Sequence, residues 1–327
     1  MLWLIWRQHR GELLAAALLL AVVAVPLIVT GVAMHQEYQS GGIGACVADP
    51  AGQRGCAQLV DQFLGRHTEW GNRLVWVTFL PSLAGVFIGA PLLAREFEHG
   101  TWRLAFTQSV TRTRWLAAKL ALVGAGVAVL ACAFATLFTW WRAPLDELGG
   151  RLRTAAFIVA APSLASLTLL AFAVGVLAGA LLRRTIAAMA VTLAVFITVR
   201  LTMEEYLRPR YRTPLVRITD PTTRPDIGWR PSTDWAVDNG WIDGSGQRLT
   251  DGRKSAIIRQ IYDGNRPAQG SGNLVEQYMA EHGLRHYTEY HPGSSFWAFQ
   301  AIESIWALGL AAVLLAATIW IVRRRTM

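Results

Sequence analysis

The chain has 327 residues, of which 53% are hydrophobic and only 16% are charged. A soluble domain has about 25% charged residues and lacks apolar runs long enough to cross a bilayer. With 14 tryptophans and a mean hydropathy of +0.32, the composition indicates a polytopic membrane protein with aromatic side chains at the membrane surfaces. The net charge of +9 does not indicate a nucleic-acid-binding protein, because no soluble module carries a basic face with interleaved aromatic residues.

Residues 1–10 place Leu2, Ile5 and Trp6 at helical spacing, with polar and basic side chains between them. This pattern predicts an amphipathic helix on the membrane surface, although it also suits a plain basic flank to the first span. A cleaved signal peptide is disfavoured, because the apolar run that follows is too long and no clear cleavage site ends it.

Six apolar runs follow, each long enough to cross a bilayer as a helix. The predicted spans are residues 13–34, 74–94, 120–141, 154–182, 186–203 and 296–322. Pro26 and Pro162 lie inside the first and fourth spans and predict bends there. The fold class is therefore an all-α polytopic membrane protein, with a membrane domain at residues 1–203 and a sixth span with a basic tail at residues 296–327.

Two of the predicted spans contain the spacing Gly-x-x-x-Gly. It occurs at Gly85 and Gly89 in the second span and at Gly175 and Gly179 in the fourth. Paired small residues let a neighbouring helix approach closely, so these positions are predicted to be packing sites.

The first loop, at residues 35–73, is polar and rich in glycine. It contains Cys46 and Cys56, whereas the third cysteine, Cys132, is in an apolar span. If this loop faces an oxidising compartment, Cys46 and Cys56 can pair as a disulfide, and otherwise they are two free thiols. A shorter polar turn is predicted at residues 142–153.

Residues 204–295 are rich in Pro, Gly, Asp, Arg and Trp and form a large loop or small domain. Helices are predicted at residues 255–262 and 273–282, and turns elsewhere. Because the apolar content is thin, we expect this region to lean on the membrane domain or on a second subunit. His282 and His286 have a spacing that could ligate a metal on a helix, but Gly283 weakens that helix, so no metal site is predicted.

Basic side chains are concentrated on one side of the predicted bundle. With the amino terminus inside, that side carries Arg7, Arg10, Arg95, Arg103, Arg112, Arg114, Lys119, Arg183, Arg184, Arg323, Arg324 and Arg325. The two short outer loops contain fewer basic residues although they are longer in total. The long loop at residues 204–295 is left out of this comparison, because long segments cross the membrane largely regardless of charge. The bias predicts that both termini are cytoplasmic and that residues 35–73 and 204–295 lie outside.

A polar segment at residues 95–115 separates the second and third spans. It begins Arg95-Glu96-Phe97-Glu98-His99-Gly100-Thr101, continues through Trp102, and ends Thr111-Arg112-Thr113-Arg114-Trp115, shortly before Lys119. Because it is short and lies between two spanning runs, it is predicted to be a membrane-side element joined without slack to both helices.

This segment resembles the loop between the second and third helices of ABC-2 type exporter permeases. That loop carries an acidic residue followed by Gly-Thr, then a Ser/Thr-Arg pair and a basic residue that opens the next helix. The matching positions here are Glu96, Gly100, Thr101, Thr111, Arg112 and Lys119. The resemblance also covers the six-span plan, although the loop before the last span is larger here than in many members.

The resemblance implies a permease subunit in a bacterial plasma membrane that receives work from a separate ATPase. Two copies of that ATPase would bind ATP and Mg, and a second permease copy would complete a homodimer or heterodimer. The sequence itself has no Gly-x-x-x-x-Gly-Lys-Ser/Thr phosphate loop and no spacing typical of a catalytic site. This chain is therefore expected to bind no cofactor and to have no enzymatic activity of its own.

The residues expected to couple the chain to the ATPase are Glu96, Glu98, Gly100, Thr101, Trp102 and Arg112. A helix across residues 96–114 would place the two glutamates at its positive end and the arginines at its negative end. Aromatic side chains along it would supply apolar contacts in a groove of the ATPase, although Trp102 equally suits anchoring in the membrane interface. The alternative is an ordinary charged loop.

Arg200 and Glu303 are the charges nearest to membrane depth, near the ends of the fifth and sixth spans. They either pair across the two helices and hold an outer gate, or extend separately to the lipid headgroups. A different class of function, a membrane enzyme or ligand-binding protein acting through residues 204–295, is the alternative to a transporter.

Overall fold

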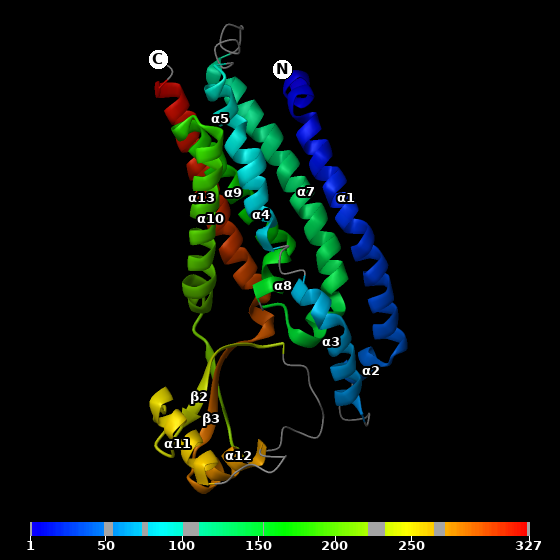
Figure 1. Ribbon diagram of the computed structural model, residues 1–327, viewed down its shortest axis with the longest axis vertical. Coiled ribbons are helices and arrows are strands. Elements are labelled where there is room, and N and C mark those ends of the chain that lie inside the picture. Colours follow the sequence, from blue (N-terminus) through cyan, green and yellow to red (C-terminus); the bar gives the residue numbers. More distant parts are fainter. Residues whose placement is uncertain are drawn as a thin grey trace.

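The computed structural model describes residues 2–48, 55–73, 78–100, 111–152, 154–221, 233–264 and 272–325. Within these residues, six helices are long and apolar enough to cross a membrane. They run alongside one another as an elongated bundle (Figure 1). Both termini lie at one end, here called the terminal end, and a small sheet lies at the other, here called the sheet end (Figure 1).

Each of the six predicted spans corresponds to a helix or a stack of helical segments. In chain order these are α1 (Leu2–Ser40); α4 (Leu80–Ala84), a π-helical segment (Gly85–Gly89) and α5 (Ala90–Glu98); α7 (Arg112–Gly149); α8 (Thr154–Val159) and α9 (Ala161–Leu182); α10 (Thr185–Thr202); and α13 (Phe296–Arg325). A π-helical turn (Met203–Leu207) and a 3-10 turn (Arg208–Arg210) continue α10, and a 3-10 turn (Gly293–Ser295) precedes α13. The predicted bend near Pro162 is a break at Ala160, between α8 and α9.

The first helix is longer than predicted. Residues 2–10 are the first turns of α1, so the prediction of a separate surface helix at residues 1–10 is wrong. The sequence contains no strong helix breaker there, because Gly11 costs only about 1 kcal/mol relative to alanine within a helix. The helix packs mainly along α7, and Leu14, Leu18 and Val22 are more than 60% exposed on its outer side.

The third span also extends further, because α7 runs on through Pro144 to Gly149. The predicted turn at residues 142–153 therefore begins eight residues too early, as only its end leaves the helix. Arg142 forms an ion pair of 3.0 Å with Asp146, one turn later. Leu145 and Leu148 join the core formed with α1 and α3. This pairing and burial keep a polar stretch helical.

Helix α9 is the most buried of the six spans and packs against α5, α7, α10 and α13. The Gly-x-x-x-Gly pairs of the second and fourth spans face each other. A Cβ atom on Gly175 would lie 2.4 Å from the carbonyl oxygen of Gly85, and one on Gly179 would lie 2.5 Å from that of Ala90. The predicted close packing is confirmed, because only glycine leaves room for the facing backbone.

The loop predicted at residues 35–73 is instead largely helical, with α2 (Ile43–Ala48) and α3 (Cys56–Arg73). A disulfide joins Cys46 to Cys56 and so links the two helices. Glu37 of α1 accepts hydrogen bonds from Arg66, at 2.5 Å, and contacts His67 at 2.9 Å. Val60 and Phe63 of α3 are fully buried against the bundle, which explains why this polar segment is ordered.

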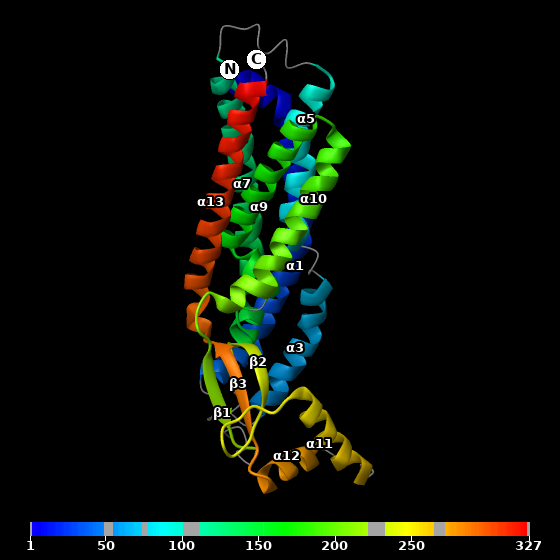
Figure 2. The ribbon, with the colours of Figure 1, turned by 90° about the vertical axis from the view of Figure 1, so that its left-hand side faces the viewer.

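Residues 204–295 contain a sheet that the sequence reading did not predict. Strands β1 (Leu215–Thr219), β2 (Trp235–Ile242) and β3 (Arg285–His291) form an antiparallel sheet in the order β1-β3-β2. The predicted helices are confirmed as parts of α11 (Asp251–Gly264) and α12 (Gly272–Glu281). The sheet lies between the bundle and these two helices (Figure 2). The membrane-spanning bundle is helical as predicted, and the described strands are confined to residues 215–291.

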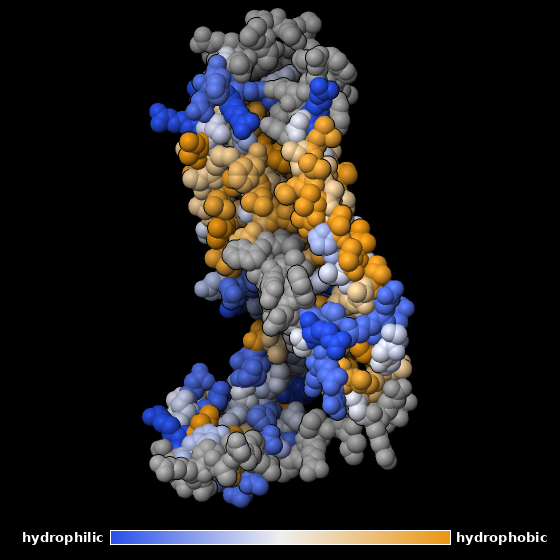
Figure 3. All heavy atoms as spheres, turned by 45° about the vertical axis from the view of Figure 1, so that its right-hand side comes forward, coloured by the Kyte–Doolittle hydropathy of each residue, from blue (hydrophilic) through white to orange (hydrophobic). Residues whose placement is uncertain are grey.

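The hydropathy of the surface agrees with a membrane-spanning bundle. On the face seen in Figure 3, hydrophobic side chains cover the middle of the bundle, and hydrophilic side chains gather at both of its ends. This distribution suits helices that cross lipid with polar ends in water.

Candidate functional site

The predicted coupling segment begins in the last turn of α5, at the terminal end. The helix ends at Glu98, and Gly100 follows with φ of +69°, a left-handed conformation that favours glycine. Thr101 and Trp102 lie outside the described residues, as does the chain up to residue 110. The described chain resumes at Thr111, directly before α7, and the side chain of Arg112 is not described.

The two ends of this segment are tied together by an ion pair. Lys119 of α7 donates a hydrogen bond of 2.5 Å from Nζ to Oε1 of Glu96 and one of 3.2 Å to the carbonyl oxygen of Leu92. The Lys119 side chain is buried, and its Nζ lies 5.3 Å from the centroid of the Trp115 ring. A buried ammonium is costly unless it is paired, so Glu96 holds α5 and α7 in one relative position.

Glu98, two residues further, contacts a different helix. Its Oε2 accepts hydrogen bonds from the backbone N–H of Thr185, at 3.0 Å, and from the Thr185 hydroxyl, at 2.7 Å. Thr185 is the first residue of α10. The first N–H groups of a helix have no partner within it and form its positive end, so the carboxylate of Glu98 caps α10.

Phe97, between the two glutamates, contacts the end of α9. The guanidinium carbon of Arg183 lies 5.6 Å from the centroid of the Phe97 ring, a cation–π contact. Arg183 has φ of +54° and closes α9. Three consecutive residues of α5 thus contact α7, the end of α9 and the start of α10. We call Glu96, Phe97, Glu98 and their partners Lys119, Arg183 and Thr185 the α5 anchor.

This geometry corrects the predicted orientation of charges along the segment. Glu96 and Glu98 lie at the carboxyl end of α5, not at the positive end of a new helix. Arg112 and Arg114 lie in the first turn of α7, not at a negative end. The reason is that the second span does not stop at Ala94 but continues for one more turn, in which the polar side chains find partners on neighbouring helices.

At the sheet end, Glu303 has a partner other than the predicted one. Nε and Nη2 of Arg208 donate hydrogen bonds of 3.1 and 3.2 Å to its two carboxylate oxygens. Both side chains are almost fully buried, and the guanidinium lies 4.1 Å from the centroid of the Phe157 ring. The predicted pairing of Arg200 with Glu303 is therefore wrong, because the turn after α10 brings Arg208 over α13.

Arg200 instead stays within reach of its own helix and the second span. It donates to the carbonyl oxygen of Thr78 and lies 3.6 Å from Glu204. Its guanidinium also lies 5.6 Å from the centroid of the Phe79 ring. The fifth span was predicted to end at residue 203, whereas the helical turns continue to Arg210. Arg208 was therefore not considered as a partner of Glu303.

Each of the three histidines of the sheet end contacts another residue of the chain. His282, directly after α12, forms a hydrogen bond with the carbonyl oxygen of Tyr278. His291 forms one with the carbonyl oxygen of Pro209. His286 lies on β3, with its ring 6.3 Å from that of Trp241. No group of three or more metal-ligating side chains occurs in the described parts of the chain.

One comparison with known proteins identifies a relationship. A family model described as "ABC-2 membrane transporter related" matches residues 17–208. The match takes in the first five spans and the α5 anchor, and it ends at the turn that carries Arg208. No curated protein and no solved structure matches this chain.

Proposed function

This chain belongs to the ABC-2 membrane transporter related family, and on that premise we propose that it is the permease subunit of an ATP-driven exporter. The family and the six apolar helices make it a multi-pass membrane protein and a membrane subunit of a transporter. Export, rather than another direction of transport, and residence in a bacterial plasma membrane are parts of the proposal.

The energy for transport would come from another polypeptide. The sequence contains no Gly-x-x-x-x-Gly-Lys-Ser/Thr loop with which to hold the phosphates of a nucleotide. We assign ATP and Mg to a separate ATPase, present in two copies beside two copies of the permease. Both termini and the α5 anchor lie at one end of the bundle (Figure 1), where basic residues are concentrated, and this supports a cytoplasmic terminal end.

The observation that carries the proposal is the convergence of three helices on the last turn of α5. Glu96 is hydrogen bonded to Lys119 of α7, and Glu98 is hydrogen bonded to Thr185 of α10. A force applied to the segment after α5 would therefore act on α7 and α10 as well, because these contacts resist separate movement. In this mechanism the ATPase contacts residues 99–114, and the α5 anchor transmits the movement to the spans.

The structure changes the role that we propose for the two glutamates. Because their carboxylates bond within the chain, they are positioning residues and not contacts to the ATPase. Arg114 is exposed at the start of α7, and with Gly100, Thr101, Trp102 and Arg112 it belongs to the proposed contact surface. Removing a glutamate would then leave the complex assembled but weaken its coupling.

The test is reconstitution with an ABC ATPase that co-purifies with this chain. In Glu96→Gln, co-purification of the ATPase should be unchanged, while stimulation of ATP hydrolysis should fall about tenfold, as expected for losing a coupling of about 1.4 kcal/mol. The exchange of charges in Glu96→Lys/Lys119→Glu should recover part of that stimulation. Glu281→Gln, an exposed carboxylate on α12, is the matched control and should behave as wild type.

Two results would contradict the proposal. If no ATPase co-purifies with the wild-type chain, the chain is not a permease of this kind. If Glu96→Gln and the double exchange both stimulate ATP hydrolysis as well as wild type, the α5 anchor does not transmit movement.

A further inference from the structure

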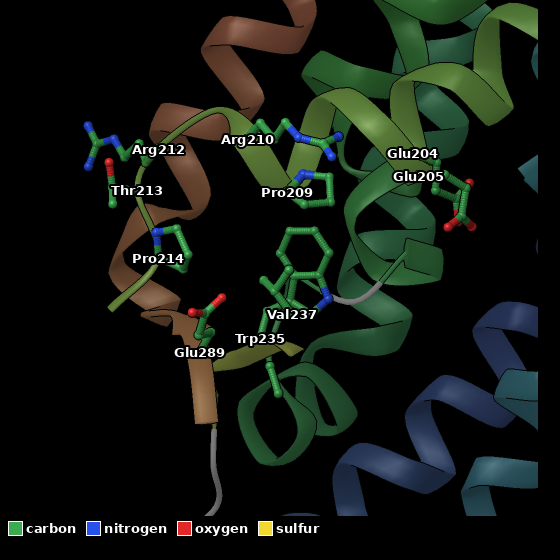
Figure 4. A pocket seen from close by; sticks show the side chains of 11 residues that line it. Glu204, Glu205, Pro209, Arg210, Arg212, Thr213, Pro214, Trp235, Val237 and Glu289 are labelled. Carbon is green, nitrogen blue, oxygen red and sulfur yellow. The ribbon is translucent and has the colours of Figure 1, made fainter. Parts of the chain in front are cut away.

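Two pockets at the sheet end differ in chemistry. The larger, of about 730 Å³, lies between the turns after α10 and the sheet, and its lining includes Glu205, Glu289, Arg210 and Arg212 (Figure 4). Charges of both signs give this pocket no preference for one kind of ligand. The smaller, of about 220 Å³, is lined mostly by apolar side chains, and we call it the α7 slot. Small-molecule sites occupy about 300–1,000 Å³, so the α7 slot suits only part of a longer molecule.

The α7 slot follows α7 toward the sheet end. Thr136 and Thr139 line it from α7, nearer the middle of the bundle. Asp146 and Arg151 line its other end, where α7 stops. The ten residues from Thr136 to Asp146 correspond to about 15 Å of helix. The slot is therefore elongated, with its charged residues gathered at one end.

Exposed tryptophans place this slot at the boundary between lipid and water. Trp140, next to Thr139 on α7, is 39% exposed, and Trp297, which lines the slot at the start of α13, is 64% exposed. Tryptophan side chains collect at the level of the lipid headgroups. The end at Thr136 therefore faces the acyl chains, and the end at Arg151 faces the headgroups.

The back of the slot is the break between α8 and α9. It is lined there by Ala156, Ala160, Ala161 and Pro162. Gln300 of α13 bonds to both sides of this break: its Nε2 donates a hydrogen bond of 2.7 Å to the carbonyl oxygen of Phe157, and its Oε1 accepts one of 3.1 Å from the N–H of Ser163. These bonds fix the wall in advance, so little order has to be imposed when a ligand binds.

One positive charge is left at the mouth of the slot. Nε of Arg142 donates a hydrogen bond of 3.1 Å to Oδ1 of Asp146, so these two charges compensate each other. Arg151 is exposed and has no ion-pair partner among the described residues. Its guanidinium carbon lies 6.0 Å from the centroid of the Phe296 ring, which also lines the slot. The mouth therefore attracts a negative charge that lies next to an apolar body.

We propose that the α7 slot binds one phospholipid with an anionic headgroup. An acyl chain lies along α7 between Thr139 and Trp297, and the headgroup faces Arg151. A phospholipid matches the slot because it is a long apolar molecule with its negative charge at one end. This binding needs neither ATP nor an ATPase, so it stands or fails independently of the transport function.

Photo-crosslinking of the full-length chain in phosphatidylcholine vesicles tests this site. The probes carry a diazirine in one acyl chain and either an anionic phosphatidylglycerol or a zwitterionic phosphatidylcholine headgroup. Crosslinks to residues 136–139 and to Trp297 should be about fivefold more abundant with the anionic probe, as expected for one arginine near the membrane surface. Leu18 and Val22, on the exposed side of α1, are the internal control and should react equally with both probes.

Three variants separate the headgroup contact from the acyl-chain contact. Arg151→Gln should remove the preference for the anionic probe in the slot and leave the crosslinks on α1 unchanged. Arg259→Gln, which alters an exposed arginine on α11, is the matched control and should keep the preference. Thr139→Trp should fill the slot and lower crosslinking to Trp297 with both probes. Arg151 is exposed, so its variant remains informative even if Thr139→Trp does not fold.

Two results would overturn the proposal, and a competition experiment supplies a third. An ordinary lipid layer without a specific site would give equal yields of both probes at residues 136–139. A preference that persists in Arg151→Gln would mean that this arginine does not hold the headgroup. Glycerol phosphate in excess should not compete, because it lacks acyl chains. Loss of the slot crosslinks in its presence would assign the site to a free phosphate instead of a lipid.

Discussion

The two ends of the bundle use the same chemistry for different purposes. At each end a buried basic side chain is held by a carboxylate from another helix: Lys119 by Glu96 at the terminal end, and Arg208 by Glu303 at the sheet end. The first pair joins two residues that are 23 positions apart in the sequence, on either side of the polar segment. The second joins two residues that are 95 positions apart. The first arrangement ties neighbouring spans to one turn of α5, and the second holds the turns after α10 against α13.

The side chains suit these roles. Arg208 makes two parallel hydrogen bonds to Glu303, a planar arrangement that fixes orientation as well as distance. Lys119 is a point charge on a flexible stem, shared between Glu96 and a backbone carbonyl. The two buried pairs therefore differ in geometry: the guanidinium of Arg208 fixes the orientation of its carboxylate partner, whereas the ammonium of Lys119 is shared between a carboxylate and a backbone carbonyl.

The sheet-end pair should give the largest effect on stability. Glu303→Gln leaves the buried guanidinium of Arg208 without its counter-charge, which should cost about 3–5 kcal/mol of the free energy of unfolding. Thermal unfolding followed by size-exclusion chromatography in detergent measures this loss. Arg208→Met/Glu303→Leu should recover most of it, because no uncompensated charge remains. A stable single variant would mean that the pair is not a rigid support.

The disulfide comes next, and its effect should be confined to the sheet end. Replacing both cysteines, as in Cys46→Ser/Cys56→Ser, should cost about 2–3 kcal/mol, since the bridge closes a short loop between α2 and α3. Hydrogen exchange should quicken in α3 and remain unchanged at Glu98 and Thr185. Replacing Cys132, which is free and exposed, is the control. Faster exchange at the terminal end would show that the two ends are not independent.

Sequence reading succeeded where a feature depends on neighbouring residues in one helix. Apolar runs located all six spans, and the glycine spacing predicted packing sites in the second and fourth spans, which the structure shows facing each other. The sequence also identified Glu96 and Lys119 as positions of the family pattern, but it did not predict that the two side chains form an ion pair. That contact depends on how α5 and α7 lie against each other, which neither helix encodes alone.

The errors share a physical cause, because they concern polar segments that are ordered by distant partners. The helix of residues 142–149 is kept by burial against α1 and α3, and Arg208 reaches Glu303 only because the chain turns back after α10. Strand β1 was not predicted from the sequence. It is short and exposed along its whole length, so it lacks the buried face that marks most strands. Its pairing with β3 supplies the order that its sequence pattern lacks.

The smallest effect is a pH dependence of the turn that follows β2, at residues 243–247. Hydrogen bonds from the Ser245 hydroxyl, the Gln247 N–H and the Ser245 N–H hold the pKa of Asp243 below its usual 3.8. A depressed pKa in the folded state stabilises the domain above the unfolded value and loses this contribution as pH falls through the folded value. The loss should therefore occur below about pH 3.8.

Amide exchange at Ser245 and Gln247, compared between pH 5 and pH 3, measures this loss. Protection of both amides should decrease in the wild-type chain, because a protonated Asp243 is a weaker acceptor. Asp243→Ala should exchange quickly at both pH values, since the turn has lost its acceptor altogether. Glu281→Gln should follow the wild type. If protection in Asp243→Ala falls with pH as steeply as in wild type, another group controls the acid sensitivity of this domain.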